Sequence, residues 1–374
     1  MSEWKKVRLG EIANYVNEKI DIKAFDTSLY ISTDSMLKDK GGIGTPESIP
    51  ESGKVTKYQH NDILVSNIRP YFKKIWFSNR EGGCSNDVLV FRANDNIDST
   101  FLYYVLSDDS FFDHIMSSAN GTKMPRGNRK LIPSFEINLP PLSTQHRIAT
   151  ILSRYDSLIE NYQKQIKLLE EAAQRLYKEW FVDLRFPGHE NTKIVDGVPE
   201  GWEKMKVGEL IAKVPRSKQI PTKDYQKKGV IPIIDQSRDY IAGYTDDMES
   251  KVESNEPYIV FGDHTRVLKF VPFPFAKGAD GTQLIMSNNL DLMPQCLLFT
   301  SLVSVDLSNY SYARHFKYLK EEEILVPTAS IANAFSKHVA KWYAKIQLNR
   351  EQLRILTEAR DRLLPKLMNG EIAV

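Results

Sequence analysis

An internal duplication constrains the fold of this chain more than any other feature of its sequence. Residues 4–12 return as residues 202–210, an offset of 198 residues. Residues 165–176 return as residues 352–363, an offset of 187 residues. Repeats of this length represent whole structural units. Each half of the chain is therefore predicted to contain a globular part followed by a long helix.

The composition is typical of a globular protein of more than one domain. A chain of 374 residues with 41% hydrophobic and 26% charged residues exceeds one ordinary core. No apolar run reaches the ~18 residues of a membrane span, and residues 1–10 lack a signal-peptide core, so we expect a cytoplasmic protein without membrane contact. The two cysteines, Cys84 and Cys296, argue against a disulfide framework and a cysteine-rich zinc site. No metal site is expected. Because the net charge is only +2, any polyanion must be bound by local basic patches.

Two long stretches have the heptad periodicity of coiled-coil helices. Apolar residues alternate at spacings of four and three from Ile148 to Trp180, and most positions 187 residues later are also apolar. Because only residues 183–201 separate the first helix from the second globular part, we expect the two helices to run antiparallel as a rod. The predicted seam comprises Leu152, Tyr155, Ile159, Tyr162, Ile166, Leu169, Leu176, Val339, Trp342, Ile346, Asn349, Leu353, Leu356 and Leu363.

Two seam positions of the second helix are polar. Asn349 fits a device that fixes helix register, and Arg360 could instead extend to the edge of the seam. Ser143 and Ser330 are candidate helix N-caps. The alternative is that each helix packs separately on its own globular part.

The globular parts have the pattern of α+β units. Short apolar runs predict strands at 63–65, 88–91, 231–234, 258–261 and 297–299. Residues 101–106 and 111–116 are predicted to form one or two short helices.

Two segments in each globular part are rich in cations and contain no carboxylates, and three of the four also contain aromatic residues. They are residues 63–80 and 117–130 in the first part, and 264–279 and 310–320 in the second. Arg and Lys on such loops suit phosphate contacts and readout of guanine edges, and amides suit contacts to bases. The alternative is that many are ordinary core aromatics and surface cations. The candidate DNA-binding residues are Asn67, Arg69, Lys73, Lys74, Lys123, Arg126, Asn128, Arg129, Lys130, Arg266, Lys269, Lys277, Gln283, Arg314, His315 and Lys317.

Convincing catalytic motifs are missing from the sequence. It contains neither a phosphate-binding loop of the G-x-x-x-x-G-K-[ST] type nor an H-E-x-x-H helix. Asp235 with Glu249 and Lys251 only weakly resembles a nuclease arrangement, and the proline pair at 140–141 lacks the preceding Asn or Asp of a methyltransferase loop. We therefore predict no catalytic residues. Two alternatives remain open: a stand-alone nuclease or methyltransferase with an unrecognised site, and a coiled-coil scaffold that joins protein partners.

Several motifs resemble the specificity subunits of type I restriction–modification systems. They are the Leu-Pro-Pro-Leu lead-in at 139–142, the heptad helix ending in Trp-Phe-Val-Asp at 180–183, the repeat start at 199–202 and the distal segment 362–372. The resemblance covers the whole chain in the order recognition domain, helix, recognition domain, helix. One departure is the segment 327–329, which lacks the double proline of the first repeat.

This resemblance implies a fold with pseudo-twofold symmetry, in which two α/β target recognition domains are separated by two antiparallel coiled-coil helices. Each domain would read one half of a bipartite DNA target. The helices would set the half-site spacing and dock two methyltransferase subunits, accompanied by restriction subunits. The chain itself would carry no cofactor, since S-adenosylmethionine, ATP and magnesium would belong to the partner subunits. The implied boundaries are 1–142 and 202–328 for the recognition domains, 143–182 and 329–374 for the helices with the C-terminal tail, and 183–201 for the linker.

Overall fold

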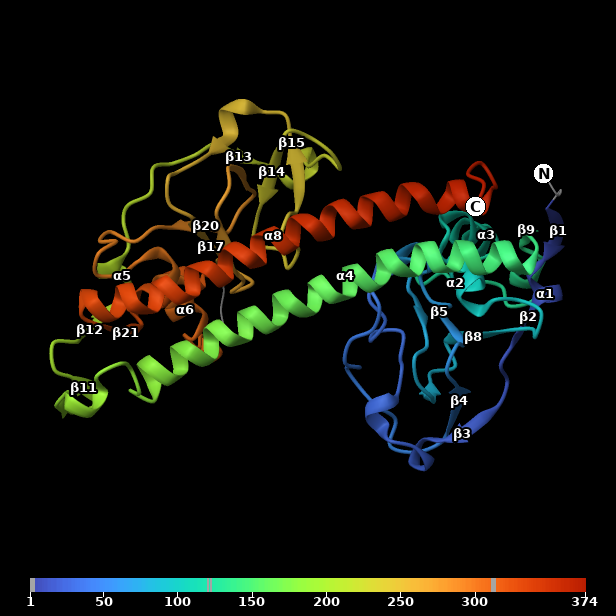
Figure 1. Cartoon of the computed structure of the whole chain (residues 1–374), viewed down its shortest axis with the longest axis horizontal. Helices are drawn as coiled ribbons and strands as arrows, with labels where there is room; N and C mark the ends of the chain where they lie inside the picture. Colours follow the sequence, from blue (N-terminus) through green and yellow to red (C-terminus); the bar gives the residue numbers. More distant parts are fainter. Residues whose placement is uncertain (1–3, 120, 122, 311–313) are drawn as a thin grey trace. The chain divides into compact units, whose positions relative to one another are not determined.

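The computed structural model describes residues 4–119, 121, 123–310 and 314–374. These divide into two compact units, which we call unit 1 (residues 1–160 and 354–374) and unit 2 (residues 161–353). Each unit combines one globular part with segments of both long helices. These helices, α4 (Leu142–Tyr177) and α8 (Ala329–Met368), are the two long ribbons in Figure 1.

Unit 1 is built on antiparallel sheets. One sheet has the strand order β2-β8-β5-β6, and a second has the order β3-β4-β7. A separate pair, β1 with β9, joins the start of the unit to the strand that precedes α4. Within unit 1, β5 and β8 lie between α4 and the pair of strands β3 and β4 (Figure 1). The strands are β1 (Lys5–Arg8), β2 (Ala13–Tyr15), β3 (Lys19–Asp21), β4 (Lys54–Tyr58), β5 (Ile63–Ser66), β6 (Ile75–Phe77), β7 (Gly82–Cys84), β8 (Val88–Ala93) and β9 (Glu136–Leu139).

Both faces of the main sheet of unit 1 are covered, which explains its continuous apolar runs. Ile63 and Val65 of β5 pack in a core shared with α2 (Ser99–Ser107), α3 (Asp109–Ser117) and both long helices. Leu64, between them, belongs to a second core around Tyr58. A short helix, α1 (Leu9–Ile12), completes the unit.

Unit 2 repeats the central part of this topology. Its sheet β18-β17-β20 corresponds to β6-β5-β8 of unit 1, and β12 pairs with β21 as β1 pairs with β9. A further sheet has the order β13-β19-β14-β15, with β16 also paired to β19. The strands are β10 (Ile194–Val195), β11 (Val198–Pro199), β12 (Glu203–Lys206), β13 (Gln219–Ile220), β14 (Ile231–Ile234), β15 (Gly243–Thr245), β16 (Lys251–Val252), β17 (Tyr258–Gly262), β18 (Leu268–Val271), β19 (Phe275–Gly278), β20 (Thr282–Ile285) and β21 (Glu323–Val326). The helices of this globular part are α5 (Val207–Leu210), α6 (Gln295–Val303) and α7 (His315–Glu321).

Four of the five predicted strands are confirmed, namely 63–65, 88–91, 231–234 and 258–261, as are the helices at 101–106 and 111–116. The predicted strand at 297–299 is wrong, because these residues lie in α6. Buried residues cover nearly every side of α6, including Gln295, Thr300 and Ser301. A helix buried all round loses its apolar periodicity and cannot be told from a buried strand.

The predicted N-caps Ser143 and Ser330 lie inside the first turn of the long helices, because α4 begins at Leu142 and α8 begins at Ala329. The carbonyl of Pro141 accepts from the backbone of Thr144 and Gln145, at 2.9 and 3.0 Å, and therefore takes the N-cap position of α4. The carbonyl of Thr328 accepts from Ala332 in the same way at the start of α8. Past the end of α8, Gly370 has the positive φ, 75°, that favours glycine after a helix.

The two long helices pair antiparallel within unit 2. The rings of Trp180 and Phe335 lie 5.8 Å apart, and the Asn349 amide donates to Gln165 at 3.1 Å, so rising numbers in one helix meet falling numbers in the other. Within unit 1, the Arg360 guanidinium donates to Asp156 at 2.8 Å. Arg360 therefore forms an ion pair at the seam rather than extending into solvent. The fourteen predicted seam residues are all buried or half-buried.

The compact units differ from the linear segments that the sequence suggests, because each unit takes helix from both repeats. The part of α4 before Asn161 belongs to unit 1 and the rest to unit 2. A short π-helix, Lys178–Val182, follows α4 and buries Trp180 and Phe181. Among the described residues, no helix combines the length and apolar character needed to cross a membrane.

Candidate nucleic-acid interface

The two basic segments predicted in unit 1 lie against each other. Ile68 and Arg126 form an antiparallel bridge, and the Arg69 backbone N–H donates to Pro125 at 2.8 Å. The Gly127 N–H donates to the carbonyl of Asn67 at 3.3 Å. Segments 66–74 and 123–130 are therefore one structural feature, which we call the basic loops of unit 1.

This close approach depends on a glycine. A Cβ at position 127 would lie 2.4 Å from Cγ2 of Ile115 and 2.8 Å from Oδ1 of Asn67. Neither distance is compatible with a side chain unless the neighbours move. Gly127 therefore allows the second basic segment to pack directly on the first.

The first basic loop contains backbone strain, and the feature recurs in unit 2. Arg69 and Lys73 flank the turn Pro70–Phe72 with φ of 48° and 49°, in the left-handed region that non-glycine residues rarely adopt. Arg266, which follows β17 as Arg69 follows β5, has φ of 61°. Such strain costs of order 1–3 kcal/mol per residue and concentrates at functional sites. Its recurrence marks the arginine loops as the candidate site in each unit.

Several predicted cations of unit 1 already have partners. The Lys73 ammonium lies 2.7 Å from Asp109, and the Arg126 guanidinium lies 3.1 Å from Asp87. Lys74 donates to the carbonyl of Thr33 at 2.6 Å, and burial lowers the pKa of its ammonium. Arg129 donates to the carbonyl of Asn86. The positions of these four cations are therefore fixed by contacts within the protein.

Lys123 and Lys130 are exposed, and neither forms an ion pair within the described part of the chain. The Oδ1 atom of Asn128 accepts from the Lys130 backbone at 3.0 Å, which fixes the turn and leaves the amide nitrogen of Asn128 available. These residues suit contact with an anion.

Two basic residues next to the first loop were missed by the sequence analysis. The backbone N–H of Lys40 donates to the carbonyl of Lys73 at 3.0 Å. The Lys38 ammonium lies 4.2 Å from the centre of the Phe72 ring. Their own segment contains Asp34 and Asp39 and no regular pattern, so no sequence signal linked it to the loop.

In unit 2, the predicted basic segments meet through Asp263. The carbonyl of Asp263 accepts from the His315 backbone at 3.0 Å, and its carboxylate accepts from the Phe316 backbone at 2.8 Å. Asp263 follows β17 as Asn67 follows β5. The same backbone contact therefore joins the two basic segments in both units.

Three predicted contact residues have buried side chains. Asn67 is 6% exposed, with its Oδ1 atom enclosed. Lys269 is 4% exposed, and its ammonium donates to the carbonyl of Asp239. His315 is 7% exposed, and its ring nitrogens lie 2.9 and 3.2 Å from the carbonyls of Asp263 and Tyr310. All three support the loops from within.

The other predicted residues of unit 2 lie nearer the surface. Arg266 is exposed and donates to the carbonyl of Leu307 at 3.1 Å. Arg314 and Lys317 are exposed, whereas Lys277 and Gln283 line a cleft of about 740 Å³. Tyr312, an aromatic of the second segment, lies outside the described residues.

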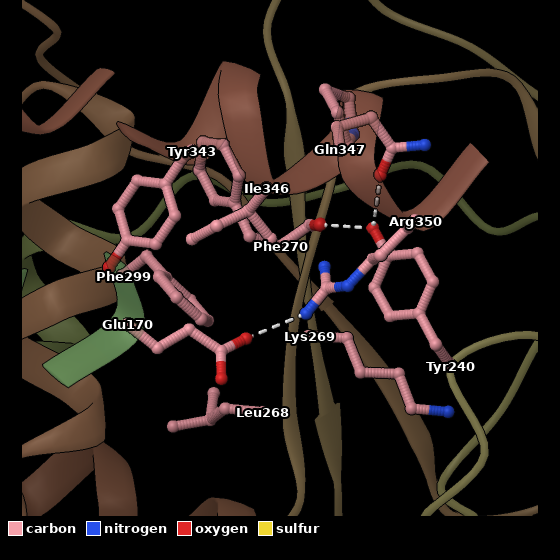
Figure 2. A pocket seen from close by; sticks show the side chains of 11 residues that line it. Glu170, Tyr240, Leu268, Lys269, Phe270, Phe299, Tyr343, Ile346, Gln347 and Arg350 are labelled. Carbon is pink, nitrogen blue, oxygen red and sulfur yellow. Dashed lines mark hydrogen bonds and ion pairs between the residues drawn. The ribbon is translucent and has the colours of Figure 1, made fainter. Parts of the chain in front are cut away.

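A smaller cavity in unit 2 joins both long helices to the second globular part (Figure 2). Arg350 of α8 donates to Glu170 of α4 at 2.8 Å and lies 3.9 Å above the Tyr240 ring. The Tyr240 hydroxyl donates to the carbonyl of Phe270 at 2.6 Å, and burial raises the pKa of Tyr240 to about 12. The cavity measures about 60 Å³, enough for one or two waters. The arrangement is a structural tie rather than a ligand site.

Within the described ranges, no group of three or more His, Cys, Asp or Glu residues is placed to hold a metal ion. Cys84 and Cys296 are buried and unpaired, and burial raises the pKa of both thiols. A protonated, buried thiol is a poor nucleophile.

Comparisons with known proteins agree with this arrangement. Residues 1–171 match the family model of the type I restriction modification DNA specificity domain. The chain is 29% identical over 308 residues to the type I restriction enzyme MjaIX specificity subunit of Methanocaldococcus jannaschii, covering 75% of this chain and 70% of that protein. It is 24% identical to the HindI specificity subunit of Haemophilus influenzae over the full length of both. The crystal structure of a type I restriction-modification S subunit from M. genitalium has a similar fold, with a TM-score of 0.63 and 17% identity, covering 98% of this chain and 96% of that chain.

Proposed function

Because the chain belongs to the family of type I restriction–modification specificity subunits, we propose that it is the DNA-recognition subunit of such a complex and has no catalytic role of its own. Each globular part reads one half of a bipartite DNA target.

The recurrence of the loop junction carries this proposal. In both units, an arginine with left-handed backbone follows the central strand, and the first residue after that strand accepts a backbone hydrogen bond from the second basic segment. Two copies of one basic surface in a single chain match two half-sites of one target. A scaffold that joins only protein partners has no need of cationic loops in both copies.

The chemistry of the cations divides the recognition task. Lys123, Lys130 and Lys317 are point charges on exposed segments and suit phosphate contacts that position the chain on the duplex. Arg69 and Arg266 carry planar guanidinium groups that match the O6 and N7 atoms of guanine. The strained backbone holds both arginines in place before DNA arrives.

The long helices have two roles in this proposal. They set the distance between the half-sites, and they dock two methyltransferase subunits, with restriction subunits completing the complex. S-adenosylmethionine, ATP and magnesium belong to those partners. The ion pair of Arg350 with Glu170 joins the two helices, and the contact of Arg350 with the Tyr240 ring adds the second globular part; together they support the first role.

Mapping methylated adenines in the host genome, with and without the gene, tests the proposal. We expect the deletion to remove methylation at one bipartite motif with an undefined spacer, and complementation with the full chain to restore it. An unchanged methylation map in a strain whose methyltransferase is shown to be active would contradict the proposal.

A further inference from the structure

The cleft of about 740 Å³ in unit 2 has a strongly basic lining. Its walls come from segment 211–219, β19, β20 and α7, which are distant in the sequence. Four cations line it, and its lining contains no aspartate or glutamate. The four are Lys213, Arg216, Lys277 and Lys320.

These cations lack carboxylate partners. None of them is in an ion pair among the residues that the structure describes, although the neighbouring Lys218 lies 2.7 Å from Asp247 and 3.2 Å from Glu249. Burial lowers the pKa of Lys277, which is the expected result when an ammonium is partly desolvated without a compensating anion. The cleft therefore concentrates uncompensated positive charge.

A polar atom in the cleft wall is also without a partner. The hydroxyl oxygen of Ser217 is buried and makes no hydrogen bond. Gln219 and Gln283 add amide groups to the same lining. A hydroxyl, amides and several cations around one cleft form a donor-rich set that suits the oxygens of a phosphodiester.

The matching positions of unit 1 carry other residues. By the repeat offsets, Lys213 corresponds to Tyr15, Arg216 to Glu18 and Lys320 to Pro133. The structure supports the last correspondence, because a Cβ on Gly10 would contact Pro133 and a Cβ on the equivalent Gly208 would contact Lys320. Three of the four cations of the cleft are thus not repeated in the first globular part.

We propose that the cleft of unit 2 binds the sugar–phosphate backbone of DNA and anchors the second globular part irrespective of base sequence. This inference rests on the proposed function, which requires the chain to bind duplex DNA. The volume lies within the roughly 300–1,000 Å³ typical of ligand clefts. The first globular part, with Glu18 and Pro133 at the matching places, has no such anchor and depends on its basic loops.

Salt dependence of binding tests the anchor, because each phosphate contact adds about 0.9 to the slope of log K against log salt. The full chain would be titrated with a labelled duplex of arbitrary sequence, about three helical turns long, at ~50–200 mM NaCl. The test variant is Lys213→Gln/Arg216→Gln. The matched control is Lys227→Gln/Lys228→Gln, which removes the same charge from exposed positions outside the cleft lining.

We expect the slope of the cleft variant to be shallower by about 2 and that of the control to equal the wild type. Circular dichroism verifies that both variants are folded, and Lys320→Gln provides an independent test from another wall of the cleft. Equal slopes for wild type and both cleft variants would overturn the anchor while leaving the proposed function intact, as would equal reductions in cleft and control variants. If the wild-type chain bound no duplex at low salt, the proposed function and the anchor would both be wrong.

Discussion

At the scale of single residues, the cations of the loops depend on buried residues that carry no positive charge. Asn67 and Asp263 occupy equivalent places after the central strands, and each accepts a backbone hydrogen bond from the second basic segment. Both are nearly fully buried. Their role is to hold two loops together, so that the arginines and lysines beside them form one surface.

Replacement of Gly127 tests this junction. Gly127→Ala places a Cβ in contact with Ile115 and Asn67, and we expect it to destabilise unit 1 by about 1–3 kcal/mol through overpacking. Urea denaturation measures the change. Gly44→Ala is the control, because its Cβ would meet only ordinary contacts at 3.7 Å or more. If both variants unfolded at the wild-type midpoint, the close approach at Gly127 would be refuted.

The burial of Lys269 should make the stability of the protein depend on pH. Burial lowers the pKa of its ammonium to about 8, below the ordinary value of 10.5. Between these two pH values the unfolded chain binds more protons than the folded chain, so the free energy of unfolding rises with pH. Below pH 8 the ammonium is charged in both states, and the full cost of burying it lowers the stability of the folded chain.

The comparison of wild type with Lys269→Met isolates this effect. We expect the free energy of unfolding of the wild type to rise relative to that of the variant as pH increases from about 8 to 10. The exposed Lys227→Met serves as control and should follow the wild type at every pH. Parallel curves for wild type and Lys269→Met would show that Lys269 is not desolvated.

At the scale of elements, the long helices pair through apolar residues interrupted by polar contacts. Asn349 is fully buried and donates to Gln165 at 3.1 Å, but its Oδ1 atom has no partner. Arg360 donates to Asp156, whose other oxygen accepts from the Tyr104 hydroxyl at 2.6 Å. Such groups specify a register at some cost in stability.

The free-energy cost of burying the Asn349 side chain can be measured. Asn349→Leu removes a buried unpaired oxygen, and we expect it to raise the free energy of unfolding by about 1 kcal/mol or more. Chemical denaturation of Asn349→Leu, Gln165→Leu and the double variant separates the hydrogen bond from the burial effect. A large loss of stability in Asn349→Leu would show instead that the hydrogen bond between Asn349 and Gln165 is strongly stabilising.

At the scale of the whole molecule, the duplication supports the proposal that one chain reads two half-sites. Each unit repeats the same framing pair of strands, β1 with β9 and β12 with β21, and the same three-stranded centre. The loops on this frame differ in sequence, so the two readers can have different targets. The charged cleft of unit 2 is one such difference.

Variants in one reader should impair one half-site. We expect Arg69→Ala or Lys123→Ala to weaken recognition of the half-site read by the first globular part, and Arg266→Ala or Arg314→Ala to weaken that of the other. Removal of a side chain that reads a base should reduce the binding free energy by about 1–3 kcal/mol. Binding of the assembled complex to targets with either half-site scrambled provides the measurement. Equal weakening of both half-sites by every variant would contradict one reader per half.

Much of the element content could be predicted from local patterns. The short apolar runs at 63–65 and 258–261 predict strands, and both faces of these strands are buried. The heptads of α4 and α8 predict long helices. The run at 297–299 was misassigned because burial on all sides removes the periodicity that separates helix from strand. The N-caps lie two residues before the predicted serines, because the backbone carbonyls of Pro141 and Thr328 accept the first hydrogen bonds of the helices.

The sequence by itself determined the duplication, the paired helices and the four basic segments, because these depend on periodicity and composition along the chain. The tertiary structure alone decided which cations are available. Lys269 and Lys277 are similar in sequence context, yet one is buried against Asp239 and the other lines an uncompensated cleft. Lys213 and Arg216 join that cleft from a segment without a sequence signal. Availability depends on burial and on partners brought from distant segments, and local residue order does not encode either.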